Sequence, residues 1–175
     1  MGLLSKLFAA KRKQPPLIVE QRAWVMVYDV PTADWQSQDD ERAGDDFAVR
    51  VLKLTRDDAR LTLLAKDYTG AAPETLAEIE AGLAAQYAAI FEITTSVQRQ
   101  HGKLLLMDRT VPALDVVADG TTDGEAWRIR ERYTTTSGHK LIIAAIGTAA
   151  EHEQFAGDID RWFRGIAFRV DTSRS

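Results

Sequence analysis

Apolar and polar side chains alternate along several stretches of the chain, which is the spacing of β-strands. Strands are predicted over Leu17–Val30, Phe47–Leu54, Ala59–Tyr68, Ile93–Gln100, Lys103–Met107, Leu114–Ala118, Glu125–Tyr133 and His139–Gly147. Turns are expected between them at Gly102, Asp119-Gly120 and Ser137-Gly138. The polar stretch Pro31–Asp46 is predicted to be a surface connection.

Two other stretches repeat apolar residues every three or four positions, which predicts amphipathic helices. The first helix follows Pro73 and presents Leu76, Ile79, Leu83, Tyr87 and Ile90. The second runs from Ala149 to Gly165 and presents Phe155, Ile159, Trp162, Phe163 and Ile166. Thr148 and Glu151 have the spacing of a capping box. The chain therefore has an α+β pattern, an antiparallel β-sheet with two main amphipathic helices packed on it.

The composition suits a single globular domain: of 175 residues, 45% are hydrophobic and 27% are charged. Residues 17–170 are expected to form this α+β domain. A basic amphipathic extension and linker at 1–16 precede it, and a tail at 171–175 follows it. The chain has no cysteine, which excludes disulfides and thiolate metal sites and favours a cytoplasmic location.

The N-terminal segment 3–13 combines an apolar helical face with a basic cluster. Its apolar residues are Leu3, Leu4, Leu7 and Phe8, and its basic cluster is Lys11, Arg12 and Lys13. Apolar burial and attraction to anionic headgroups would act together, so the segment is a candidate for peripheral membrane contact or for docking on a partner. The alternative is a short tail, because isolated helices of this length are marginal in water.

The net charge of −4 is unevenly distributed along the chain. Residues 1–16 contain four basic side chains and no acid, so the acidic excess lies in the remainder. Binding to a phosphate backbone needs a basic surface. No nucleic-acid partner is therefore expected.

The sequence shows no pattern typical of a catalytic, cofactor or metal site. His101, His139 and His152 lie in separate predicted elements without metal-ligand spacing. Glycine-rich phosphate loops are absent, and neither Ser96 nor Ser137 lies on a glycine-flanked elbow. The expectation is a protein that is not an enzyme and that has no metal and no cofactor.

The clearest candidate site is a row of arginines on one predicted strand. Arg128, Arg130 and Arg132 alternate with other residues, so all three should leave the same face of the sheet. Such a row could hold a carboxylate or a phosphate. The alternative is a solvated face whose arginines pair with acids on the neighbouring strand. On the opposite face Glu131 lies between apolar positions, where a carboxylate needs a partner or a place at the sheet margin.

The C-terminal third resembles the PsbP-like fold. The resemblance rests on the Tyr133 strand, the Gly138 turn, the apolar strand Leu141–Ala145, a helix with Glu153-Gln154-Phe155, and the terminal Phe168. The earlier stretch Leu61–Leu64, the helix from Glu74 and the Gly102 hairpin fit the same layout, so the resemblance extends over roughly residues 18–168. In bacteria this fold includes the DcrB proteins and the Eag chaperones of type VI secretion effectors. The resemblance implies a non-enzymatic domain that binds another protein, and Eag-type members are cytoplasmic dimers. The absence of cysteine disfavours a DcrB-type lipoprotein.

Two functions follow as hypotheses. The first is a cytoplasmic protein-interaction domain, an adaptor or a chaperone with a secretion-related role as one option, that uses the sheet face and segment 3–13; a homodimer stays open. The second is a binding domain for a small anionic or lipid-like ligand, held by Arg128, Arg130 and Arg132.

Overall fold

The computed structural model describes residues 24–28, 30–43, 47–70, 74–106, 109–136 and 138–170. The predictions for the extension and linker at 1–16, for the first part of the strand at 17–23 and for the tail at 171–175 lie outside the described residues.

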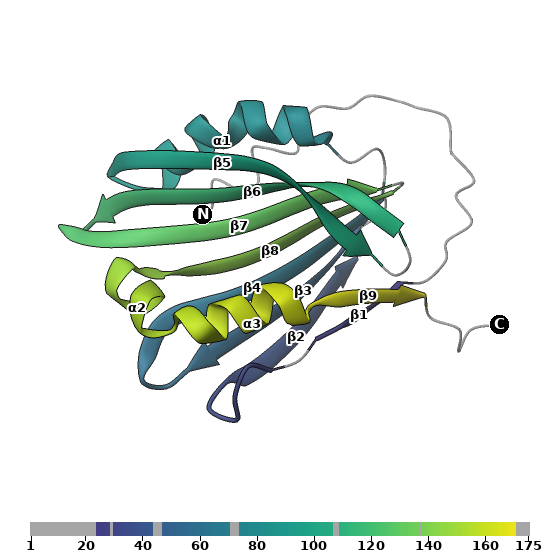
Figure 1. The fold of residues 1–175 in the computed structure, drawn as a ribbon, viewed down its shortest axis with the longest axis horizontal. Coiled ribbons are helices and arrows are strands. Elements are labelled where there is room, and N and C mark those ends of the chain that lie inside the picture. Colours follow the sequence, from purple (N-terminus) through teal and green to yellow (C-terminus); the bar gives the residue numbers. More distant parts are fainter. Residues whose placement is uncertain are drawn as a thin grey trace.

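The fold is built on a seven-stranded antiparallel sheet with the order β2-β3-β4-β8-β7-β6-β5. Its strands are β2 (Gln36–Ala43), β3 (Phe47–Arg56), β4 (Ala59–Gly70), β5 (Ile93–Leu106), β6 (Arg109–Thr122), β7 (Glu125–Thr136) and β8 (His139–Thr148). Two consecutive meanders, β2 to β4 and β5 to β8, meet where β4 pairs with β8. The sheet is strongly twisted, and β5 curls at one end toward a separate two-stranded sheet (Figure 1).

The second sheet joins distant parts of the chain. β1 (Trp24–Val27) pairs with β9 (Ala167–Val170) in antiparallel register. The sequence predicts β1 within its first strand but not β9, since four residues are too few to show a period.

Alternate residues of β8 belong to two cores on opposite faces of the sheet. Leu141, Ile143 and Ala145 join a cluster with Ile159, Trp162 and Phe163 from the last helix. Ile142 and Ile146 pack instead against a cluster that contains Leu83 and Tyr87 of the first helix. Each face of the sheet is therefore covered by a helix, as its period-two pattern requires.

The helices are α1 (Leu76–Ile90), α2 (Ala149–Gln154) and α3 (Ala156–Gly165). α1 starts after a capping box of Thr75 and Glu78, whereas Pro73 lies outside the described residues. The predicted capping box of Thr148 and Glu151 is confirmed at the start of α2. The prediction of one helix from Ala149 to Gly165 is wrong, because the helix breaks at Phe155, whose backbone leaves the helical region.

Three further predictions are wrong in their element boundaries. Residues 36–43 form the edge strand β2, not a loop; its exposed side chains leave no apolar period to detect. Gly102 lies inside β5 and Gly120 inside β6, and neither makes a turn. The turn between β6 and β7 lies instead at Asp123 and Gly124, both with positive φ.

Candidate functional site

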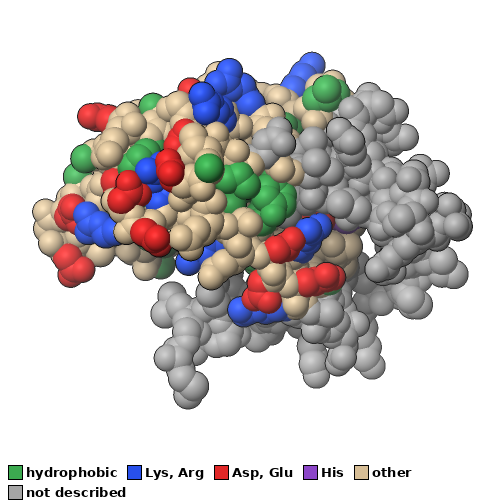
Figure 2. Space-filling model, turned by 90° about the horizontal axis from the view of Figure 1, so that it is seen from below, with side chains coloured by type: hydrophobic (Ala, Val, Ile, Leu, Met, Phe, Trp, Pro, Cys, Tyr) green, Lys and Arg blue, Asp and Glu red, His purple; other side chains and the backbone are tan. Residues whose placement is uncertain are grey.

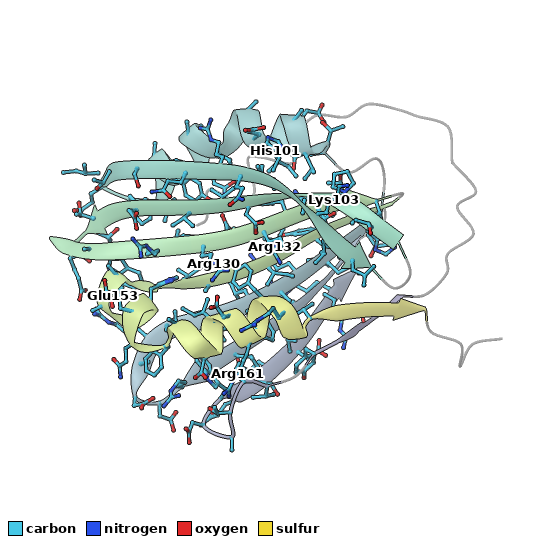
Figure 3. The ribbon with its side chains drawn as sticks, viewed as in Figure 1. His101, Lys103, Arg130, Arg132, Glu153 and Arg161 are labelled. Carbon is cyan, nitrogen blue, oxygen red and sulfur yellow. The ribbon has the colours of Figure 1, made fainter. Side chains whose placement is uncertain are left out.

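The three arginines of β7 leave the same face of the sheet. Ile129 and Tyr133, which alternate with them, are buried in the cluster under α1 on the opposite face. Arg128, Arg130 and Arg132 therefore face the side of α2 and α3. Figure 3 shows Arg130 and Arg132 pointing from β7 toward α3.

Each arginine of the row contacts a carboxylate. Arg128 Nε lies 2.7 Å from Asp119 Oδ1, and Arg132 Nε lies 2.7 Å from Asp115 Oδ1. Both acids stand on β6 directly opposite their arginines in the strand register. For these two arginines, the contacts are those of the alternative interpretation, in which the arginines pair with acids on the neighbouring strand.

Arg130 is bound differently from the other two arginines. The residue opposite it on β6 is Val117, so the neighbouring strand offers no acid. Its guanidinium reaches instead to α3, where Nη1 lies 2.8 Å from Asp160 Oδ1 and Cζ lies 4.4 Å from the centroid of the Phe163 ring. The Asp160 side chain is 52% exposed. Arg130 is thus held by one oxygen of an exposed carboxylate, in addition to its contact with Phe163.

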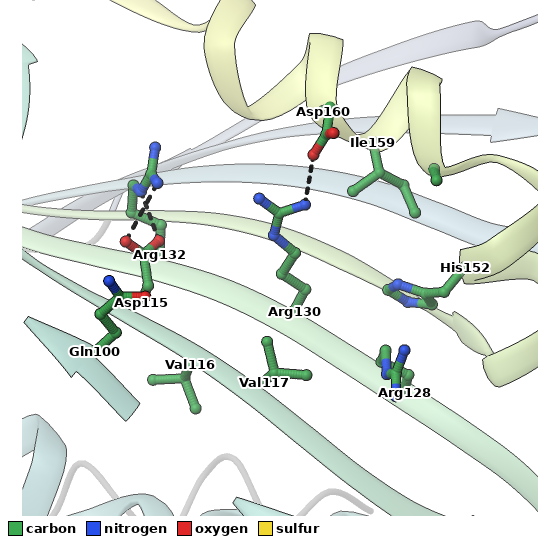
Figure 4. Close-up of a pocket in the computed structure, with 11 residues that line it drawn as sticks. Gln100, Asp115, Val116, Val117, Arg128, Arg130, Arg132, His152, Ile159 and Asp160 are labelled. Carbon is green, nitrogen blue, oxygen red and sulfur yellow. Dashed lines mark hydrogen bonds and ion pairs between the residues drawn. The ribbon is translucent and has the colours of Figure 1, made fainter. Parts of the chain in front are cut away.

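A groove of about 510 Å³ lies between β5–β7 and the helices α2 and α3. We call it the arginine groove, and it is lined by Gln100, Asp115, Val116, Val117, Arg128, Arg130, Arg132, His152, Ala156, Ile159 and Asp160. Figure 4 shows Arg130 reaching up to Asp160 and His152 pointing from α2 toward the strands. The groove therefore unites the whole predicted arginine row.

The ion pair of Arg128 and Asp119 holds both side chains in the charged state. Burial alone would raise the pKa of Asp119, but the hydrogen bonds from Arg128 and the charge of Arg128 bring that pKa below its usual range. The hydrogen bond to Asp119 in turn raises the pKa of Arg128. Acidic and basic side chains are also intermixed on the face of the molecule seen from below (Figure 2). A ligand anion would have to compete with these carboxylates.

His152 is a buried imidazole at the α2 end of the groove. The residue is 7% exposed, and within the described ranges its Nε2 has no hydrogen-bond partner. Burial, together with the nearby Arg128 charge, lowers the pKa of His152 to about 4. The imidazole is therefore neutral at pH 7, and its Nε2 is a buried nitrogen without a hydrogen-bond partner among the described residues.

Glu131 has its partners inside the core under α1. The hydroxyl of Tyr133 donates to Glu131 Oε2 at 2.6 Å, and the hydroxyl of Tyr87 donates to the same oxygen. Burial raises the pKa of Glu131. The residue faces away from the arginine groove, so it belongs to the core and not to the candidate site.

The remaining histidines lie apart from the groove. His101 Nε2 lies 3.0 Å from Glu80 on α1, and His139 Nδ1 lies 2.9 Å from Asp67 on β4. Within the described ranges no group of three or more His, Asp or Glu side chains is arranged to hold a metal ion. Among the described helices, none has the length and hydropathy that crossing a membrane requires.

The sequence prediction assigns neither Asp160 nor His152 to a site, although both line the groove. Both lie in the predicted second helix, but periodicity does not show over which strands a helix will cross. On β6, Val117 lies opposite Arg130, between the two aspartates that lie opposite the other arginines. This missing acid is the signal that could have pointed to a partner for Arg130 outside the sheet.

Comparison with known proteins assigns no family to the chain. No protein-family model matches it, and no curated protein sequence matches it. A solved structure, LpqN of Mycobacterium tuberculosis, which is described as involved in cell envelope biogenesis, is similar with a TM-score of 0.41 and 10% sequence identity. The match covers 83% of this chain and 91% of LpqN. A likeness of this size supports no conclusion about function.

Proposed function

We propose that this chain is a non-catalytic protein-interaction domain, an adaptor or a chaperone, that binds an acidic surface of a partner protein in the arginine groove. The observation that carries the proposal is the ion pair of Arg130 with the exposed side chain of Asp160. This guanidinium stands in the middle of the groove, and the carboxylate that neutralises it is exposed and contributes one oxygen. A partner carboxylate could replace Asp160 without unpairing any other charge of the row.

Two further features support a non-catalytic binding role. The flanking arginines are fixed by bidentate contacts with Asp115 and Asp119, so the groove presents its charges on rigid strands. The resemblance of the sequence to the PsbP-like fold also points to a non-enzymatic domain that binds another protein. A cytoplasmic location belongs to the same proposal and rests on the absence of cysteine.

Affinity purification from the native cell tests the proposal. Wild type is compared with Arg130→Glu and with the control Arg50→Glu. Arg50 also pairs with an aspartate, Asp39, and its side chain is 31% exposed against 34% for Arg130, but it lies on β3. We expect a stoichiometric partner that Arg50→Glu retains and Arg130→Glu loses. Equal capture by all three proteins would contradict binding in the groove.

A truncated protein that starts at Pro15 belongs in the same purification. It tests the hypothesis that residues 3–13 dock on the partner or on a membrane. If they dock, recruitment is lost while the melting temperature stays unchanged. Unchanged recruitment would end that hypothesis.

A second candidate function is the binding of a small anionic ligand in the same groove. It is favoured by the three guanidinium groups that line the groove and by a volume within the range of about 300–1,000 Å³ for small-molecule sites. Native mass spectrometry of the purified protein separates the two functions. A bound mass that Arg130→Glu loses would favour the small ligand, and its absence would leave the protein partner.

A further inference from the structure

The outer edge of β5 is the longest uncovered strand edge of the described sheet. β5 is the last strand in the sheet order and pairs with β6 on its inner side. It runs for 14 residues, more than twice the usual length of about 5–6. Among the described residues, no backbone hydrogen bond reaches its outer side. With respect to the described part of the chain, a long row of backbone donors and acceptors is therefore open to another strand.

The edge carries positive charge that the rest of the described structure does not neutralise. Arg99, His101 and Lys103 alternate and are exposed, and β5 contains no acidic residue. His101 contacts Glu80, but Arg99 and Lys103 have no ion pair within the described ranges. The arginines of the groove, in contrast, all contact carboxylates. Figure 3 shows His101 and Lys103 along β5, apart from Arg130 and Arg132.

We propose that this edge binds an extended acidic segment of the partner protein as an added strand. The inference rests on the proposed function that the chain binds another protein. Main-chain hydrogen bonds would supply affinity, and alternate side chains would supply specificity. Acidic residues at every second position of the segment would face Arg99 and Lys103. The intervening residues would lie on the side of Gln100, which lines the arginine groove.

The positive charges of Arg99 and Lys103 favour a segment of another protein over a second copy of this chain. Two β5 edges paired with each other would bring Arg99 and Lys103 against like charges, which is unfavourable. The other free edge, β2, is acidic, but its Asp39 and Asp40 already pair with Arg50 and Arg42. An acidic partner segment satisfies the unpaired cations of β5 without breaking an existing ion pair.

Binding of model peptides to the full chain tests the strand addition. The probe is an eight-residue peptide with blocked ends and alternating glutamate and valine, measured by isothermal titration. One version carries N-methyl groups on all glutamate amides and another on all valine amides. Alternate amides of a strand point to opposite edges, so we expect one methylated peptide to bind at least about tenfold more weakly. The other should bind within about twofold of the parent.

Charge reversal on the protein gives the second readout. The double variant Arg99→Glu with Lys103→Glu should bind the parent peptide about tenfold more weakly. The control Lys53→Glu with Arg161→Glu changes the net charge equally on β3 and α3 and should stay within about twofold. Equal loss with both methylated peptides, or equal loss in both double variants, would overturn the added strand.

The outcomes separate this inference from the proposed function. A partner captured from cells, together with no binding of any peptide, would overturn the added strand and leave the protein-binding function standing. Peptide binding without any captured partner would contradict the proposed function and would leave only the capacity of the β5 edge to accept an acidic strand. Self-association of the wild type that the Arg99→Glu and Lys103→Glu variant abolishes would overturn the acidic segment in favour of a second copy.

Discussion

At the scale of single residues, Glu131 illustrates how a strand pattern can identify an unusual position without identifying its partner. The alternation of β7 places this carboxylate on the core face, and the structure confirms that it is buried. One partner, Tyr133, is two residues away, but Tyr87 comes from α1, 44 residues away. The second partner could not be predicted, because it depends on where α1 crosses the sheet.

Glu131→Gln should stabilise the protein at neutral pH. Burial raises the pKa of Glu131 in the folded protein above its value of about 4.5 in the unfolded chain. The protonated side chain therefore contributes fully to the stability of the fold below pH 4.5, and this contribution is lost as pH rises through the folded pKa. Glutamine still offers an oxygen to both tyrosines and carries no charge. We expect a higher melting temperature than wild type at pH 7, and we expect this gain to vanish near pH 4.

Thermal melts of both proteins from pH 4 to pH 8 measure this difference. His152 titrates in the opposite direction, since its folded pKa of about 4 makes the fold lose stability as pH falls. His152 is present in both proteins and cancels when the two melts are subtracted. If Glu131→Gln is less stable than wild type by the same amount at every pH, the charge of Glu131 does not destabilise the folded protein.

At the scale of elements, the two misassigned glycines have different structural roles. A Cβ on Gly120 would lie 2.7 Å from the carbonyl oxygen of Ile93 and would collide with the Phe91 ring. A Cβ on Gly102 would meet only the Asp115 carboxylate, at 3.6 Å. Glycine inside a strand can thus mark a close approach of another element, and sequence alone does not distinguish this from a turn.

Gly120→Ala is therefore expected to destabilise the fold, and Gly102→Ala is its matched control. The added methyl group at Gly120 must displace Phe91, which is 5% exposed, or the backbone that leads into β5. Overpacking of this kind costs about 1–3 kcal/mol. Urea denaturation should show that loss for Gly120→Ala and a change below about 0.5 kcal/mol for Gly102→Ala. Equal midpoints for the two variants would contradict the close packing at Gly120.

The strongly periodic elements are the ones that the sequence predicts well. α1, β3, β4 and β7 have a regular apolar period, and β8 is a continuous apolar run because both of its faces are packed, so these patterns report their structure. β2 is exposed and β9 is short, so neither shows a period. For the site, alternation brings Arg128, Arg130 and Arg132 to one face. The groove also needs α3 above them, and this placement is a long-range contact that no local pattern contains.

At the scale of the whole molecule, the arginines of the groove contact carboxylates, whereas Arg99 and Lys103 on the β5 edge have no ion pair within the described ranges. Gln100 belongs to both surfaces, because it lies on β5 and lines the groove. A partner that adds a strand to β5 would therefore stand at the rim of the groove. The two surfaces therefore adjoin each other at Gln100, although Arg99 and Lys103 lie on the opposite face of the sheet from the groove.

Asp160→Asn should strengthen binding of an acidic partner. The guanidinium of Arg130 donates a hydrogen bond to the carboxylate of Asp160. Asp160 therefore competes with a carboxylate of the partner for Arg130. An exposed ion pair is worth up to about 1 kcal/mol, which predicts up to about fivefold tighter binding. Isothermal titration with the captured partner measures the change. Asp158→Asn, on the same helix but paired with Arg56, is the control and should leave affinity unchanged.

The most direct test of the account is the dissociation constant of the captured partner for three proteins: wild type, Arg130→Glu and Asp160→Asn. Circular dichroism melts first establish that each protein is folded. We expect Arg130→Glu to bind at least about tenfold more weakly than wild type and Asp160→Asn to bind more tightly. The same dissociation constant for all three proteins would show that the partner does not bind in the arginine groove.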